Sequence, residues 1–183
     1  MKILLSYNTT KKFQIIICFT IIIVLLTGCS FHIFAAGRNQ EEIASLKGRL
    51  SLFQKALDEF GAISPEQAAN LWAKGVKNRN GALQYAVMDN KLKEKFSNIL
   101  EKERQSWVTG GSSPWVETYK IFSSEKKDET TYEIIVRFKM MTSYADMGSY
   151  NANLLIEKED NYWGIKNIEM ESLLKKYLRY PDL

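Results

Sequence analysis

The sequence predicts an α+β fold in which N-terminal helices pack on a bent antiparallel sheet. Up to about residue 100 the apolar residues recur with the helical period of 3.6, and after the Gly110–Pro114 loop they recur with the period of 2 that is typical of strands. The segments of the second half are joined by short connections and have one polar face, which favours antiparallel hairpins. We therefore expect the helices to cover one side of the sheet.

The N-terminus is organised like an export signal. Two lysines precede an apolar stretch from Phe13 to Leu26, and small residues follow where a signal peptidase cuts. Leu26, the last residue of the stretch, is followed by Thr27, Gly28 and Cys29. This ending resembles the lipobox of bacterial lipoproteins, in which the cysteine receives a diacylglyceryl group. The resemblance implies a signal peptide over 1–28, lipid attachment at Cys29 and a tether over 29–40.

A lipid on Cys29 predicts that the mature chain lies outside the cytoplasm, anchored to the cell membrane. The two acyl chains of a diacylglyceryl group provide a durable anchor without a spanning helix. The alternative is an uncleaved N-terminal transmembrane helix, since Phe13 to Ala36 is long enough to cross a bilayer with about 20 residues. Gly28, Ser30 and His32 interrupt the apolar run and favour cleavage. Both readings place the C-terminal domain outside.

The composition of the exported part excludes several classes of site. Cys18 leaves with the signal and Cys29 carries the lipid, so no disulfide is expected. His32 is the only histidine and lies beside the lipid, which excludes histidine catalysis and histidine metal ligation. We expect no metal and no cofactor. Removal of the three lysines of the signal reduces the net charge of +4 to +1, too little for nucleic acid binding.

A helical spacer is predicted over 41–61. Its apolar residues alternate in steps of three and four, and we call the six of them the heptad seam: Ile43, Leu46, Leu50, Phe53, Leu57 and Phe60. Fewer than three heptads is short for an independent coiled coil. We therefore expect the seam to dock on its own domain, with a homodimer through 43–60 as the alternative. Gly61 is expected to end the helix.

An α+β domain is predicted over 62–183, and its helical half has clear start signals. Ser64 as N-cap, Pro65 in the first turn and Gln67 at the capping-box position predict a helix that runs to Asn78. A shorter segment follows, and Asp89 caps a further helix. The apolar face of that helix consists of Leu92, Phe96, Ile99 and Leu100.

The second half contains four predicted strands. They cover Trp115 to Phe122, Tyr132 to Met141, Tyr150 to Lys158 and Tyr162 to Glu169. The second strand has the clearest pattern, because one face holds only apolar and aromatic residues, Tyr132, Ile134, Val136, Phe138 and Met140, and the other face holds the charged residues Glu133, Arg137 and Lys139. Ser172 to Leu178 is expected to add a last helical turn.

The order of these elements, with the closing segment Asn161 to Glu169, resembles the nuclear transport factor 2-like superfamily. The resemblance covers Ser64 to Glu169 and implies a cone-shaped sheet with a cavity at its open end. It implies no activity, because the superfamily includes isomerases, dehydratases, cyclases and members without chemistry. The candidate wall of the cavity consists of Trp72, Tyr85, Tyr119, Tyr132, Val136 and Trp163. The alternative for each of them is a place in the core.

These observations predict a non-catalytic, membrane-anchored binding or accessory lipoprotein, which holds a protein partner or a small apolar ligand at the cell envelope. One alternative is a small lyase or isomerase, which needs a carboxylate with a raised pKa in a dry pocket. Asp146 is the only candidate for that carboxylate, although the segment from Ser143 to Tyr150 most simply forms a hairpin turn. The other alternative is a signal-anchored dimeric envelope protein that associates through the heptad seam.

Overall fold

The computed structural model describes residues 40–103 and 106–183. The predicted signal peptide, the lipobox and the tether up to residue 39 lie outside the described residues and stay predictions. The chain divides into two compact units, Met1–Phe53 and Gln54–Leu183. Within the described ranges, no helix combines the length and the apolar character that a membrane span requires.

The predicted spacer is a helix over 40–59. In the first unit, the side chains of Ile43, Leu46, Leu50 and Phe53 are 51%, 47%, 65% and 66% exposed. The last two residues of the heptad seam belong to the second unit, where Leu57 packs against the hydrophobic core and Phe60 is exposed. Leu57, partly buried, is therefore the residue of the heptad seam that packs against the core of the second unit.

Three helices follow in the second unit: α2 (Pro65–Lys77), α3 (Gly81–Tyr85) and α4 (Asn90–Glu103). The predicted caps form, because Ser64 Oγ accepts a hydrogen bond from Gln67 N at 3.1 Å and Asp89 Oδ1 accepts one from Leu92 N at 2.6 Å. Gln67 Oε1 accepts from Ile63 N, one residue before the position that a capping box uses. The start signals in the sequence therefore placed these helices correctly.

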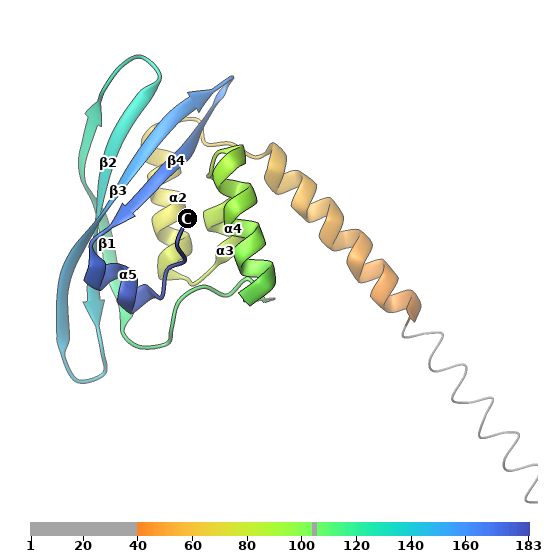
Figure 1. The fold of residues 1–183 in the computed structure, drawn as a ribbon, viewed down its shortest axis with the longest axis horizontal. Coiled ribbons are helices and arrows are strands. Elements are labelled where there is room, and N and C mark those ends of the chain that lie inside the picture. The colour runs from red at the N-terminus through yellow and green to blue at the C-terminus, as the bar shows by residue number, and fades with distance from the viewer. Residues whose placement is uncertain (1–39, 104–105) are drawn as a thin grey trace, which may run out of the picture. The chain divides into compact units, whose positions relative to one another are not determined.

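The sheet consists of β1 (Trp115–Lys126), β2 (Thr131–Met141), β3 (Asp146–Glu159) and β4 (Tyr162–Met170). The strands lie in sequence order and every neighbouring pair is antiparallel. Figure 1 shows α2, α3 and α4 on the same side of this sheet. This arrangement confirms the α+β fold of helices on an antiparallel sheet. A last helix, α5 (Ser172–Leu178), has the predicted bounds.

All four strands are longer than the sequence predicts, β2 and β4 by one residue each and β1 and β3 by four or more. β1 continues past Phe122 to Lys126, and β3 begins at Asp146 instead of Tyr150. The added residues are mostly polar, yet they remain paired with β2. The pattern of apolar residues does not reveal such strand ends, because at these ends the backbone hydrogen-bond pairing with β2 continues through polar residues.

The space between the helices and the sheet is filled by large side chains. Ile134, Val136, Phe138 and Met140 of β2 are completely buried, as is Trp72 of α2. The Trp72 indole packs edge-on against Phe138 at 5.8 Å, and its Nε1 donates a hydrogen bond to the Tyr180 hydroxyl at 3.0 Å. Trp72 and Val136, both candidates for a cavity wall, are thus part of the hydrophobic core.

Backbone segments from the helical half pair with β4. Trp163 N donates to Ala62 O at 2.8 Å, and Ile165 N donates to Val87 O at 2.8 Å. Asp89 N in turn donates to Ile165 O at 2.9 Å. This pairing covers part of an edge strand that is otherwise open to association. It also brings the segment after the spacer helix and the α3–α4 connection to the β3–β4 turn.

Candidate functional site

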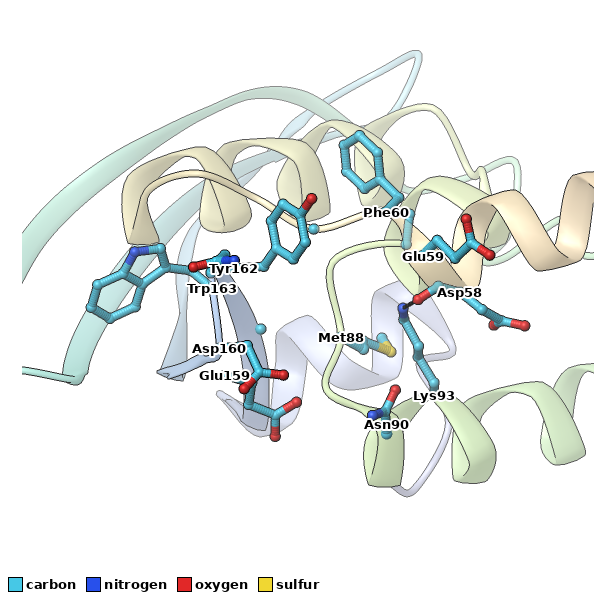
Figure 2. A pocket seen from close by; sticks show the side chains of 14 residues that line it. Asp58, Glu59, Phe60, Met88, Asn90, Lys93, Glu159, Asp160, Tyr162 and Trp163 are labelled. Carbon is cyan, nitrogen blue, oxygen red and sulfur yellow. Dashed lines mark hydrogen bonds between the residues drawn. The ribbon is translucent and has the colours of Figure 1, made fainter.

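A pocket of about 370 Å³ lies where three segments of the second unit meet (Figure 2). They are the end of the spacer helix with Gly61, the α3–α4 region from Ala86 to Lys93, and the β3–β4 turn from Glu159 to Gly164. We call it the joint pocket. The backbone pairing of Ala62 and of residues 87–89 with β4 holds these segments together.

Lys93 is a buried lysine beside the joint pocket. Only 6% of it is exposed, and its Nζ donates hydrogen bonds to the carbonyl oxygens of Leu57 and Asp58, each at 3.2 Å. A cation at this point stabilises the carboxyl end of the spacer helix. Burial lowers the pKa of the Lys93 ammonium, against the opposing effect of nearby carboxylates, with Asp58 first. Two of the three ammonium donors are thus directed at the helix end.

Tyr85 makes a second connection to the same helix end. Its hydroxyl donates a hydrogen bond to Asp58 Oδ1 at 2.5 Å, and its ring packs edge-on against Trp107 at 5.4 Å. The ring also lies 5.5 Å from Lys93 Nζ. Burial, together with the hydrogen bond to Asp58, raises the pKa of Tyr85 to about 12. Tyr85 therefore ties α3 to the spacer helix in its neutral form.

The replacement Tyr85→Phe is expected to weaken the pH dependence of stability in alkali. The folded-state pKa of Tyr85 lies above its ordinary value of 10.0, so its contribution is complete below pH 10 and is lost as the pH rises from 10 to about 12. Urea unfolding at pH 9 and pH 11 measures this difference. The wild type should lose more stability between the two pH values than Tyr85→Phe, and equal losses would contradict the role of the Asp58 bond.

Three carboxylates of the joint pocket lack partners in the described part of the chain. The side-chain carboxylates of Glu59, Glu159 and Asp160 make neither a hydrogen bond nor an ion pair with any residue of 40–103 and 106–183, although the charge of Glu159 acts on Lys93 and Lys166 from a longer distance. On the sheet, by contrast, carboxylates pair with lysines: Glu117 with Lys139, Glu133 with Lys127, and Glu157 with Lys166. Four carboxylates line the pocket against one ammonium group, that of Lys93, so the potential in the pocket is negative.

Two aromatic rings are exposed at the joint pocket. Phe60 is 44% and Tyr162 is 48% exposed. Figure 2 shows Glu159 and Asp160 on the opposite side of the pocket from Asp58 and Glu59. The wall therefore combines aromatic faces with unpaired negative charge.

Gly61 and Tyr162 are in close contact in the wall of this pocket. A Cβ atom added at Gly61 would lie 2.2 Å from Tyr162 Cγ and 2.3 Å from its Cβ. Only a residue without a side chain allows the Tyr162 ring to approach the backbone this closely. The helix ends at residue 59 and Gly61 does not have the positive φ that the prediction of a helix-ending glycine assumed, so its role in the structure is this close contact with Tyr162.

The six predicted wall residues occupy different places. Trp72 and Val136 are in the core, and Tyr85 is 5% exposed beside the joint pocket. Trp163 lines the joint pocket, but its indole points away from Lys93 and packs edge-on against Tyr132 at 5.3 Å (Figure 2). Tyr119 lines another pocket, with Arg137 and Lys139. Of the six candidate wall residues, only Tyr132 and Trp163 are therefore in direct ring contact with each other.

Sequence reasoning missed Asp58, Lys93, Glu159 and Asp160. Lys93 lies three residues before Phe96 and seven before Leu100, both buried, so it occupies the apolar face of α4. A lysine at such a position was the available signal. For the acidic residues the sequence contained no such signal, because Glu159 and Asp160 are residue types that are common in ordinary turns.

Asp146 lacks the environment of a general base. Its side chain is 56% exposed, accepts a hydrogen bond from Gly148 N at 2.8 Å and lies 3.5 Å from Lys139 Nζ. The bond from Gly148 and the charge of Lys139 lower the pKa of Asp146. Acid–base chemistry in a dry pocket needs the opposite shift. Asp146 therefore does not support the lyase or isomerase alternative.

The described residues contain no cluster of three or more His, Cys, Asp or Glu side chains that is placed to hold a metal ion.

Comparison with models of known protein families gives no match, and a search of curated proteins finds no similar chain.

Proposed function

We propose that this protein is a lipid-anchored, extracytoplasmic binding protein without catalytic activity, which holds its ligand in the joint pocket. The lipobox supports the location, and helices on one face of a four-stranded antiparallel sheet are compatible with a cone of the nuclear transport factor 2-like type. The observation that carries the binding role is the joint pocket, with its unpaired carboxylates and exposed rings.

The chemistry of the joint pocket favours a small organic cation with an apolar body. Glu59, Glu159 and Asp160 attract positive charge, and Phe60 and Tyr162 offer aromatic faces. A cation over an exposed aromatic ring gains about 0.5–1 kcal/mol. An ammonium group on an apolar body uses both features, whereas a purely apolar ligand leaves the charge of the carboxylates unused.

The anchor is tested with the variant Cys29→Ser. We expect mass spectrometry to find a mature wild-type chain that begins at a diacylglyceryl-modified Cys29, located in the membrane fraction. The variant should accumulate as the uncleaved precursor, because lipid transfer to the thiol precedes cleavage. A wild-type chain that still contains Met1 and an unmodified Cys29 would instead support the signal-anchor alternative.

Ligand binding is tested by NMR on the full-length protein in a neutral detergent, with methionine methyl groups labelled. The probe is benzyltrimethylammonium. Met88 lines the joint pocket, whereas Met140 lies in the core and is the internal control. We expect the probe to shift the Met88 methyl resonance and leave that of Met140 unchanged. Benzyl alcohol and benzoate, which lack the positive charge, should have little effect.

The double variant Glu159→Gln/Asp160→Asn should bind the probe about five- to tenfold more weakly, since each exposed charge contributes up to about 1 kcal/mol. Glu169→Gln removes one charge near the other end of β4 and is the control. Because the double variant removes two charges, a control that loses half as much binding free energy would assign the effect to overall charge. An unmoved Met88 resonance at millimolar probe would contradict the proposed ligand class.

A further inference from the structure

We propose that the part of the heptad seam in the first unit binds a second copy of this chain as a parallel, in-register coiled coil. The residues concerned are Ile43, Leu46, Leu50 and Phe53, which are 47% to 66% exposed. Within the described residues 40–53, they form an apolar stripe along a single helix and have no partner helix in their own unit. A second copy supplies the same stripe, which is the self-complementary surface that a symmetric dimer requires.

The charges beside the stripe match a parallel pair. With Ile43 and Leu50 at position a of the heptad and Leu46 and Phe53 at position d, Glu42 occupies g and Lys47 occupies e. In a parallel coiled coil, a g residue faces the e residue of the following heptad in the partner. Each Glu42 therefore faces Lys47 of the partner subunit, and two-fold symmetry forms the pair twice.

An antiparallel pair lacks this match. If it buries the same four apolar residues, Ile43 lies opposite Phe53 of the partner subunit and the dyad falls near Gly48. Two copies of Lys47 and two of Arg49 then approach each other at the centre. Like charges in such positions are destabilising. The sequence of charges thus selects the parallel arrangement.

Attachment to a membrane favours the same geometry. Two heptads are marginal for association in solution, but tethering two copies to one surface raises their effective concentration. A lipid on Cys29 and an uncleaved N-terminal helix both place the same end of each copy at the membrane. Either form of attachment therefore favours the parallel pair, whatever ligand the joint pocket binds.

Cysteine cross-linking of the full-length protein in its membrane tests the arrangement. In a Cys18→Ser background, Leu46→Cys and Phe53→Cys should each form a disulfide with the same position of the second copy. Ser51→Cys lies outside the stripe and is the control, and the Cys18→Ser parent gives the background from Cys29. When Leu46→Cys and Leu50→Cys are produced together, a disulfide that forms only between these two different positions would indicate an antiparallel pair. Cross-linking of Ser51→Cys to the same extent as Leu46→Cys would indicate random collision. Either result overturns the proposal.

A charge exchange tests the predicted contacts. Glu42→Lys should reduce the cross-linked fraction of Leu46→Cys about fivefold, because two exposed pairs change from attraction to repulsion. Glu42→Lys/Lys47→Glu should restore it. Failure of the double exchange to restore cross-linking would contradict the Glu42–Lys47 contact.

Leu50→Asp separates the dimer from the alternative in which the stripe docks on its own domain. In a dimer, this variant abolishes cross-linking and leaves the melting temperature of the domain unchanged. If the wild type is already monomeric and Leu50→Asp lowers its melting temperature, the stripe docks on its own domain. That result would overturn the proposal.

Discussion

The variant Trp72→Ala is expected to lose about 3–5 kcal/mol of unfolding free energy, the range for removal of a fully buried large aromatic side chain. Trp72 has no exposed surface and contacts both Phe138 of the sheet and Tyr180 near the C-terminus. Its replacement leaves a cavity between α2 and β2, and it leaves the Tyr180 hydroxyl without its donor. Urea unfolding of the full-length protein in a neutral detergent measures the loss.

Trp115→Ala is the matched control, because Trp115 is 38% exposed at the start of β1. This variant should lose much less stability, since part of its surface is already in water. Tyr180→Phe isolates the hydrogen bond to Trp72 and should cost about 1 kcal/mol. If Trp72→Ala cost no more than Trp115→Ala, the space around Trp72 would not be a packed core. The cavity that the superfamily resemblance implies would then have support at that place.

Gly61→Ala is expected to destabilise the second unit by about 1–3 kcal/mol, as overpacking of a closely packed site does. The added methyl group would overlap Cβ and Cγ of Tyr162, which belong to the rigid base of that side chain. Tyr162 must move, and the wall of the joint pocket changes with it. The expected results are a lower urea midpoint and weaker binding of the cationic probe.

Gly48→Ala is the control for this variant. Gly48 lies in the spacer helix with no atom within 4 Å of an added Cβ, so alanine should be neutral or stabilising there. A double-mutant cycle with Tyr162→Gly identifies the cause, because Gly61→Ala should cost little once the Tyr162 side chain is absent. A cost that stays the same in the Tyr162→Gly background would show that the backbone at Gly61, and not the contact with Tyr162, is responsible.

The local part of this fold could be predicted because its signals lie close together in the sequence. Ser64 and Asp89 cap helices through residues three positions away, and α5 has its predicted bounds. The alternation in β2 identified a strand with one buried face. The true start of β3 was missed, because Asp146 has the composition of a turn and only its pairing with β2 makes it part of the strand.

The candidate site could not be predicted in the same way. The superfamily resemblance implied a cavity at the open end of a cone, and two of its six candidate wall residues, Trp72 and Val136, have no exposed surface. The joint pocket instead depends on Lys93 and on acidic residues whose sequence neighbours are ordinary. Lys93 has its hydrogen-bond partners, Leu57 and Asp58, 35 or more residues away in the sequence, and the acidic residues come together only through the fold.

The sequence by itself determined the class of fold and most helix and strand positions, and it contains the resemblance to a lipobox on which the proposed location depends. These properties follow from periodicity, caps and composition, which act over a few residues. Only the tertiary structure decided that the spacer end, the α3–α4 region and the β3–β4 turn form one pocket. The physical reason is that such a pocket arises from backbone pairing between distant segments, namely Ala62 with Trp163 and Met88 with Ile165. No short-range pattern in the sequence specifies these contacts.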